Sequence, residues 1–170
     1  MNMQKPLDVV VIGGGVAGIT VASNLAQRGI HVSLVERESA LGGNGTTDCC
    51  KAVDGKCQLC GGCLLADHLE AINTLSNLDL HTQTTVTQVK RVNGGFSVEL
   101  SAQTATGMPL HADAIILATG FDHVDAHAKG PYGYGILPAV TTGQEMERRL
   151  KEEGQAAYDF LQGRKVAFIQ

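Results

Sequence analysis

The feature that most constrains the fold is a glycine-rich turn near the N-terminus. The residues Gly13-Gly14-Gly15-Val16-Ala17-Gly18 satisfy the pattern G-x-G-x-x-G, with an apolar stretch before them and a helical apolar pattern after them. In such a unit the first glycine permits a tight turn, the second lets a pyrophosphate approach the backbone, and the third allows close helix–strand packing. Glu36 ends the next apolar stretch. The sequence therefore predicts a Rossmann-like dinucleotide-binding unit over residues 7–36.

The expected ligand site combines the N-terminus of a helix with an acidic side chain. Free N–H groups and the helix dipole favour a diphosphate at this end of the helix. A carboxylate after the second strand accepts hydrogen bonds from a ribose diol and disfavours the extra phosphate of an NADP-type ribose. The candidate cofactor contacts in this unit are Gly13, Gly15, Val16, Ala17, Gly18 and Glu36.

Composition limits the partners of the chain. Its 170 residues, 44% of them hydrophobic, suit about one domain with a buried core. The net charge is −4 and the chain has no Lys/Arg run, so it lacks the basic footprint that binds nucleic acids or anionic membranes. No apolar stretch reaches the ~18 residues of a membrane span, and the N-terminus lacks the pattern of a signal peptide. We therefore expect a cytoplasmic protein without a membrane span.

All five cysteines fall within one short segment, whereas disulfide-rich secreted domains distribute theirs along the chain. The spacing Cys57-x2-Cys60-x2-Cys63 is typical of a loop that supplies three thiolates to a [4Fe–4S] cluster. Cys49 or Cys50, upstream in the same segment, is expected to supply the fourth ligand. The spacing therefore favours an iron–sulfur site within residues 44–63.

Three other interpretations of the cysteine segment stay open. Zinc accepts four thiolates tetrahedrally, and His68 is an alternative ligand for it. A dithiol of Cys57 and Cys60 facing a flavin would carry electrons as a reversible disulfide. The third interpretation, free cysteines with a purely structural role, is disfavoured by their density in the sequence.

The middle of the chain predicts short elements separated by turns. Apolar periodicity predicts a helix near 64–77. The period then changes to two and predicts a hairpin with its turn at Asn93-Gly94-Gly95. A short apolar run at 114–120 predicts a buried strand, and the glycine-rich residues 121–140 predict an irregular segment.

The C-terminal part predicts one helix and one strand. Thr142 and Glu145 match a capping box that opens a polar helix ending by Gly154. Residues 145–153 are interpreted as a charged helix face without a further role. The apolar residues 165–170 predict a last strand, which needs a neighbour to pair with.

The histidines provide no clear catalytic signal. His31, His81 and His111 are most simply solvated or core residues. His123 and His127 follow the Ala-Thr-Gly turn, where the edge of a flavin would lie. They are candidate proton donors, and the pattern assigns the role to neither.

Two further segments resemble motifs of the two-dinucleotide-binding flavoproteins. Arg37 followed by Leu41-Gly42-Gly43 resembles the extension of their first motif, and Ala118-Thr119-Gly120 resembles their second flavin motif. The resemblance implies FAD as the cofactor, with Arg37, Gly42, Gly43, Ala118, Thr119 and Gly120 among its contacts. Such proteins bring a backbone to the adenine in the region that matches residues 84–89, which makes Val86 a further candidate contact.

Taken together, VVVIGGGVAGI, LVERESALGG, the cysteine segment, LATGFD, YGYG and KVAFIQ resemble the A subunit of heterodisulfide reductase and its relatives. The resemblance runs from residue 7 to the end of the chain. It implies a thioredoxin-reductase-like fold with FAD and iron–sulfur clusters, in a complex that exchanges electrons with other subunits and with hydrogenase or formate dehydrogenase. It also implies that the cluster ligands are among Cys49, Cys50, Cys57, Cys60 and Cys63.

The chain departs from this family in two places. Many relatives carry a ferredoxin-like module between the strands that match FSVEL and AIILATG, where this chain has only residues 102–112. In the family, the FIQ strand continues with a cysteine, which some members encode as selenocysteine by UGA. We expect residue 170 to precede either such a codon or the boundary of a naturally split protein.

The sequence thus predicts an α/β, Rossmann-like FAD-binding domain of the thioredoxin-reductase type with a β-meander. Residues 1–140 are expected to form its first half, and residues 141–170 a connecting helix and the first strand of a second nucleotide-binding-like domain. The leading functional hypothesis is a FAD- and iron–sulfur-dependent electron-transfer subunit. The alternatives are a flavin–dithiol disulfide reductase and a zinc-stapled nucleotide-binding module.

Overall fold

The computed structural model describes residues 7–52, 55–60, 62–102 and 108–169. The chain divides into two compact units. The first comprises Met1–Gly45 and Cys63–Phe121, and the second comprises Thr46–Gly62 and Asp122–Gln170. The glycine turn therefore lies in the first unit, and every cysteine except Cys63 lies in the second. The domain boundary expected after residue 140 stays a prediction.

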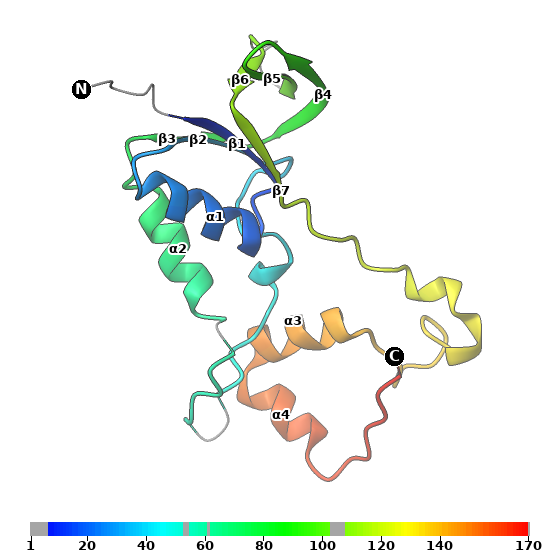
Figure 1. Cartoon of the computed structure of the whole chain (residues 1–170). Coiled ribbons are helices and arrows are strands. Elements are labelled where there is room, and N and C mark those ends of the chain that lie inside the picture. The colour runs from blue at the N-terminus through cyan, green and yellow to red at the C-terminus, as the bar shows by residue number, and fades with distance from the viewer. Residues whose placement is uncertain (1–6, 53–54, 61, 103–107, 170) are drawn as a thin grey trace. The chain divides into compact units, whose positions relative to one another are not determined.

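A four-stranded parallel sheet forms the centre of the first unit (Figure 1). Its order is β3-β2-β1-β7, with strands β1 (Asp8–Ile12), β2 (His31–Val35), β3 (Leu78–His81) and β7 (Ala114–Leu117). Strand β1 pairs in parallel with β2 and with β7. Because parallel strands end at the same edge of a sheet, Gly13, Glu36 and Ala118 follow their strands at one edge.

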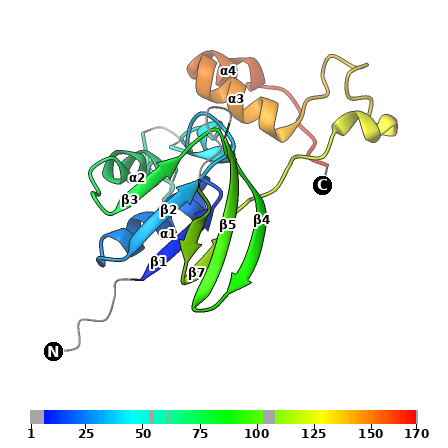
Figure 2. The same ribbon diagram turned by 90° about the horizontal axis from the view of Figure 1, so that it is seen from above.

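Two helices, α1 (Val16–Ala26) and α2 (Leu64–Ile72), cover one face of this sheet, as Figures 1 and 2 show. Alternate residues of β1 and β2 point toward the helices, because side chains alternate between the two faces of a strand. Ile19 of α1 is fully buried in this layer. The buried residues of this cluster are Val9, Val11, Ile19, Ala22, Ala26, Val32, Leu34, Leu65, Ile72 and Leu78.

An antiparallel sheet covers the opposite face. It has the order β4-β5-β6, with β4 (Thr84–Val92), β5 (Gly95–Ala102) and β6 (Leu110–Ala112). Val10 and Val35 point from the parallel sheet into a second core cluster, where Val98 of β5 and Ala112 of β6 meet them. The Rossmann-like α/β unit with a β-meander, predicted from the sequence, is confirmed.

The second unit contains short helices and irregular segments. Its longest helix is α3 (Gly143–Glu153), followed by α4 (Gln155–Leu161), and two 3-10 turns, η2 (Ala126–Ala128) and η3 (Gly130–Tyr132), precede them. A further 3-10 turn, η1 (Gly43–Thr46), leads into the cysteine segment. The capping box predicted for α3 is present: the Glu145 N–H donates to Thr142 Oγ1, and the Thr142 N–H donates to the Glu145 carboxylate.

Three expectations about local structure are wrong. Residues 165–169 form no strand, because no described strand offers them a partner, and Gln170 lies outside the described residues. Strand β7 forms as expected but lies at the edge of the sheet, so Leu117 is 75% exposed rather than buried. Helix α4 forms between Gly154 and residue 165, where the sequence predicts no element.

No helix within the described ranges combines the length and the apolar composition that a bilayer crossing requires.

Candidate functional site

The glycine turn between β1 and α1 contains two close approaches of backbone to backbone. A Cβ atom at Gly13, whose φ is +106°, would lie 2.3 Å from the carbonyl oxygen of Ala118. A Cβ atom at Gly18 would lie 1.8 Å from the carbonyl oxygen of Gly13. Side chains cannot occupy such positions, so both residues must be glycine for the turn, the helix and the end of β7 to meet.

Gly15 differs from these two glycines because the position that a Cβ atom would occupy there is open space. It is the N-cap residue of α1, and a Cβ atom there would meet no other atom within 4 Å. The first N–H groups of a helix have no partners inside the helix, so those at Val16 and Ala17 are available to a ligand. The helix dipole adds partial positive charge at the same place. This geometry fits a diphosphate.

Glu36 is held beside the turn by backbone hydrogen bonds. Its side chain is buried, its Oε2 accepts the N–H of Gly14 at 2.6 Å, and its Oε1 accepts the N–H of Glu38 at 2.8 Å. Each carboxylate oxygen has two lone pairs and can accept a further hydrogen bond. The carboxylate is therefore fixed in orientation and keeps the capacity to bind a ribose hydroxyl.

The segment after β2 runs alongside the glycine turn. The N–H of Gly42 donates to the carbonyl oxygen of Gly14 at 2.7 Å, and Gly15 and Gly42 form an isolated parallel bridge. A Cβ atom at Gly43 would lie 3.1 Å from the Cα of Gly15. Arg37 is exposed, with its Nε 3.4 Å from a Glu38 carboxylate oxygen. The structure thus brings Gly42 and Gly43 to the turn.

The residues that follow β7 lie beside the glycine turn, next to Gly13. The N–H of Ala118 donates to the carbonyl oxygen of Ile12 at 2.8 Å, and Thr119 and Gly120 follow as exposed residues. Val86 pairs with Leu100 in the antiparallel sheet and packs against the second core cluster. Its role as an adenine contact stays a prediction. The residues at the turn itself fit FAD.

His81 has an environment that the sequence does not indicate. It ends β3 beside β2, and its carbonyl oxygen accepts the N–H of Glu36 at 2.9 Å. Within the described part of the chain, its Nε2 is the one buried side-chain nitrogen or oxygen without a hydrogen-bond partner. Such an atom lowers stability, because it loses its hydration without compensation.

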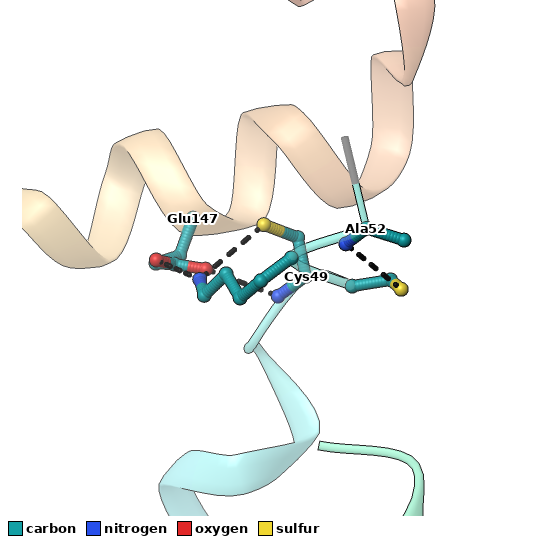
Figure 3. Close-up of polar contacts among 5 residues, drawn as sticks. Cys49, Ala52 and Glu147 are labelled. Carbon is teal, nitrogen blue, oxygen red and sulfur yellow. Dashed lines mark hydrogen bonds and ion pairs between the residues drawn. The ribbon is translucent and has the colours of Figure 1, made fainter. Parts of the chain in front are cut away.

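The cysteine segment begins with two adjacent residues in opposite environments. Cys49 is buried, and Cys50 is exposed. The N–H of Cys49 donates to Glu147 Oε2 at 3.0 Å, and the Cys49 Sγ lies 3.5 Å from Lys51 Nζ (Figure 3). Burial, followed by a hydrogen bond with Glu147, raises the pKa of the Cys49 thiol. The surroundings of Cys49 therefore favour the neutral thiol over the thiolate.

The other cysteines of the second unit are exposed and have backbone amides as neighbours. The Cys50 Sγ accepts the N–H of Ala52 at 3.5 Å, and the Cys57 Sγ accepts the N–H of Leu59 at 3.4 Å. Hydrogen bonding by the Gly62 amide, and then by the Lys51 amide, lowers the pKa of the Cys60 thiol. Cys63, in the first unit, is the N-cap residue of α2 and is exposed.

The donor chemistry of this segment suits a soft metal centre, because thiols that accept amide N–H groups are typical iron–sulfur ligands. Among the residues that the structure describes, no three His, Cys, Asp or Glu side chains are gathered so that they could hold one metal ion. A cluster would have to draw the exposed thiols together as it binds.

The interpretation of 145–153 as a charged face without a further role is wrong. Glu147 accepts the Cys49 N–H and forms an ion pair with Lys51, and one turn later Lys151 Nζ donates to the carbonyl oxygen of Thr46. Helix α3 thus holds the start of the cysteine segment. No local pattern could reveal this, because Glu147 lies 98 residues after Cys49.

His127, one of the two candidate proton donors, lies in a cavity of about 330 Å³ within the second unit. Its Nδ1 is 2.8 Å from Asp125 Oδ1, and its ring lies edge-on to Tyr134. The Tyr134 hydroxyl donates to Glu145 Oε1 at 2.6 Å. This bond, followed by one from the Thr142 amide, lowers the pKa of Glu145 to about 2. The cavity is therefore lined by a carboxylate that is ionised at neutral pH and accepts hydrogen bonds from Tyr134, Thr141 and Thr142.

Comparisons with known proteins agree with this architecture. The model of the pyridine nucleotide-disulphide oxidoreductase family matches residues 7–169. The A subunit of a ferredoxin/F(420)H(2)-dependent CoB-CoM heterodisulfide reductase from Methanosarcina acetivorans is 25% identical over 251 residues, which cover 99% of this chain and 31% of that protein. An iron-sulfur A subunit of a CoB–CoM heterodisulfide reductase from Methanopyrus kandleri is 33% identical over 242 residues, which cover 95% of this chain and 36% of that protein.

A solved structure shows the same fold. The L-proline dehydrogenase from P. horikoshii superposes with a TM-score of 0.53 and 26% identity, covering 68% of this chain and 23% of that one. This chain spans about a third of the length of the two curated relatives. The aligned 251 residues exceed the 170 residues of this chain, so the first relative carries residues here that this chain lacks.

The resemblance to the heterodisulfide reductase A subunit that the motifs indicate is confirmed, and with it the class of FAD-dependent oxidoreductases. Since the matched family model extends over nearly the whole sequence, the chain belongs to the pyridine nucleotide-disulphide oxidoreductase family.

Proposed function

We propose that this chain is the FAD-binding part of an electron-transfer subunit in a heterodisulfide reductase-like complex. The observation that carries the proposal is the glycine turn, where the open side of Gly15, the N-terminus of α1 and the Glu36 carboxylate meet. The first two suit a diphosphate, and the third suits a ribose diol. The proposed FAD contacts are Gly13, Gly15, Val16, Ala17, Gly18, Glu36, Arg37, Gly42, Gly43, Val86, Ala118, Thr119 and Gly120.

When bound, FAD supplies two-electron redox chemistry. The residues of this chain bind and orient it. The amides at the start of α1 compensate the diphosphate charge, and Glu36, held by the Gly14 and Glu38 amides, fixes the ribose. The exposed backbone after β7, at Thr119 and Gly120, leaves room for the cofactor beside the turn.

The second part of the proposal is a [4Fe–4S] cluster with Cys57, Cys60 and Cys63 as ligands and Cys49 or Cys50 as the fourth. Its support is the sequence spacing and the exposed thiols that accept backbone N–H groups. The relative from Methanopyrus kandleri carries "iron-sulfur" in its name. A cluster accepts single electrons, so a flavin with such a cluster would convert an electron pair into single steps.

The proposed partners are the other subunits of a heterodisulfide reductase-like complex, since several relatives are named as subunits of such reductases. Hydrogenase or formate dehydrogenase is the proposed electron donor, on the basis of the family resemblance. A cytoplasmic location completes the proposal, because free thiols and iron–sulfur ligands persist in reducing compartments.

One observation favours a second function, a flavin–dithiol disulfide reductase. Cys57 and Cys60 form a C-x-x-C pair, and the amides of Gly62 and Lys51 lower the pKa of the Cys60 thiol. A lowered pKa increases the thiolate fraction, which is the form that attacks a disulfide. The Cys57–Cys60 dithiol would then carry electrons from the flavin in place of a cluster.

Anaerobic purification, followed by quantification of iron, acid-labile sulfide, zinc and FAD per chain, separates these functions. About four iron and four sulfide per chain, as a cubane requires, with bound FAD support the electron-transfer proposal. FAD without metal would instead support the flavin–dithiol disulfide reductase, provided that the reduced flavin also reduces a Cys57–Cys60 disulfide. Zinc without FAD would indicate the zinc-stapled module.

A further inference from the structure

The sequence leaves the fourth ligand of the proposed cluster undecided between two adjacent cysteines, and the structure treats these two differently. Cys49 is 6% exposed, whereas Cys50 is exposed. Their Sγ atoms also have different neighbours: the ammonium group of Lys51 for Cys49, and the backbone amide of Ala52 for Cys50. The packing of the loop therefore distinguishes the two candidate ligands.

Cys49 belongs to a set of contacts that ties the loop to α3, defined here as the α3 clamp: Cys49, Lys51 and Glu147. Glu147 accepts the N–H of Cys49 and forms an ion pair with Lys51, whose Nζ also lies 3.5 Å from the Cys49 Sγ (Figure 3). The backbone of Cys49 thus contacts Glu147, and its side chain contacts Lys51. Rotating its Sγ toward a cluster would separate the thiol from Lys51 and expose a buried side chain.

Lys51 connects the α3 clamp to the rest of the loop. Its ammonium group binds Glu147, and its backbone amide donates a hydrogen bond to the Cys60 sulfur. The clamp therefore also sets the position of an amide that contacts Cys60. Lys151, one turn after Glu147, binds the carbonyl oxygen of Thr46 and secures the start of the same segment.

Cys50 shares its local geometry with Cys57 and Cys60, the first two cysteines of the C-x2-C-x2-C motif. The Cys50 Sγ accepts the N–H of the residue two positions later, as does the Cys57 Sγ, and the Gly62 amide has the same spacing from Cys60. Amide donors to sulfur are a recurring feature of thiolates that bind iron. No side-chain contact within the described residues restrains Cys50 in the way that Lys51 restrains Cys49.

We infer that Cys50 is the fourth cluster ligand and that the α3 clamp holds Cys49 out of the coordination shell, with Glu147 as a positioning residue. This inference rests on the proposed iron–sulfur function. It assigns to Cys49 a packing role and to α3 the role of presenting the loop.

The test compares Cys49→Ser with Cys50→Ser in the full chain, purified anaerobically beside the wild type. We expect Cys49→Ser to retain about four iron and four sulfide per chain with an unchanged EPR spectrum of the reduced cluster. We expect Cys50→Ser to lose at least one iron or to change the spectrum. The assignment would be overturned if Cys49→Ser lost iron while Cys50→Ser retained the full cluster. It would also be overturned if both variants gave the same result.

A second measurement needs no cluster. In the metal-free chain, alkylation by iodoacetamide followed by peptide mass spectrometry is expected to modify Cys49 at least tenfold more slowly than Cys50. Glu147→Gln is expected to reduce this difference, whereas Glu152→Gln, at an exposed position of the same helix, leaves it unchanged. Equal wild-type rates would refute the clamp. A wild type without iron but with a protected Cys49 would refute the proposed function and leave the clamp intact.

Discussion

Gly15 and Gly18 belong to one turn, but we expect alanine substitutions at these positions to have different effects. Gly18→Ala is expected to destabilise the fold, and Gly15→Ala is expected to weaken cofactor binding. At Gly18 the added Cβ would lie 1.8 Å from the Gly13 carbonyl oxygen, a backbone atom that cannot rotate away. Overpacking of this kind costs about 1–3 kcal/mol, against a gain of about 1 kcal/mol in helix propensity. The difference between these two terms predicts that Gly18→Ala lowers the free energy of unfolding by up to about 2 kcal/mol.

At Gly15 the added Cβ meets no atom within 4 Å, so the fold tolerates it. Because alanine is a poorer N-cap residue than glycine, a loss of up to about 1 kcal/mol in unfolding free energy is expected. The methyl group would instead fill the space assigned to the diphosphate. A steric cost of about 1–3 kcal/mol there corresponds to a Kd for FAD about 5–150 times weaker.

Urea denaturation followed by circular dichroism measures the first effect, and titration of flavin fluorescence measures the second. Gly143→Ala is a matched control, because its Cβ also meets no atom within 4 Å and it lies outside the turn. Equal destabilisation by Gly15→Ala and Gly18→Ala would refute the open space at Gly15. Wild-type affinity for FAD in Gly15→Ala would refute the placement of the diphosphate.

Three further predictions follow from single contacts. Glu36→Ala leaves the Gly14 N–H without its acceptor, so urea titration is expected to show a loss of about 1–3 kcal/mol; an unchanged value would contradict that contact. His81→Phe removes the unpartnered Nε2 and is expected to raise the unfolding free energy by about 1 kcal/mol, while a large loss would indicate a hidden partner. Because the Glu145 pKa is depressed from 4.5 to about 2, its contribution to stability is complete above pH 4.5 and lost as pH falls toward 2. Tyr134→Phe, which removes the donor to Glu145 Oε1, is expected to raise this pKa in NMR titrations, and an unshifted titration would refute the bond.

The parts of the fold that could be predicted depend on signals close together in the sequence. The glycine turn, the strands around it and Glu36 all lie within residues 7–36, and backbone sterics alone relate them. The hairpin turn at Asn93 and Gly94 and the capping box of α3 are local in the same sense. Each pattern specifies a backbone conformation over a few residues, so it can be recognised without knowledge of the rest.

The incorrect predictions involve segments whose partners are distant in the chain or absent from the described residues. Residues 165–169 have the composition of a strand, yet a strand exists only where another strand accepts its hydrogen bonds. Leu117 is apolar but exposed, because β7 lies at the edge of the sheet. Composition describes what a segment can bury, and the topology decides whether anything covers it.

The sequence by itself determined the α/β class, the dinucleotide turn and the clustering of thiols in one loop, since these depend on residue type and spacing. Only the tertiary structure decided that the Ala118 carbonyl closes the glycine turn, that Glu147 reaches Cys49 across 98 residues, and that Cys49 is buried while Cys50 is exposed. Such contacts join residues far apart in the chain. They arise from the packing of whole elements against one another, which no local spacing encodes.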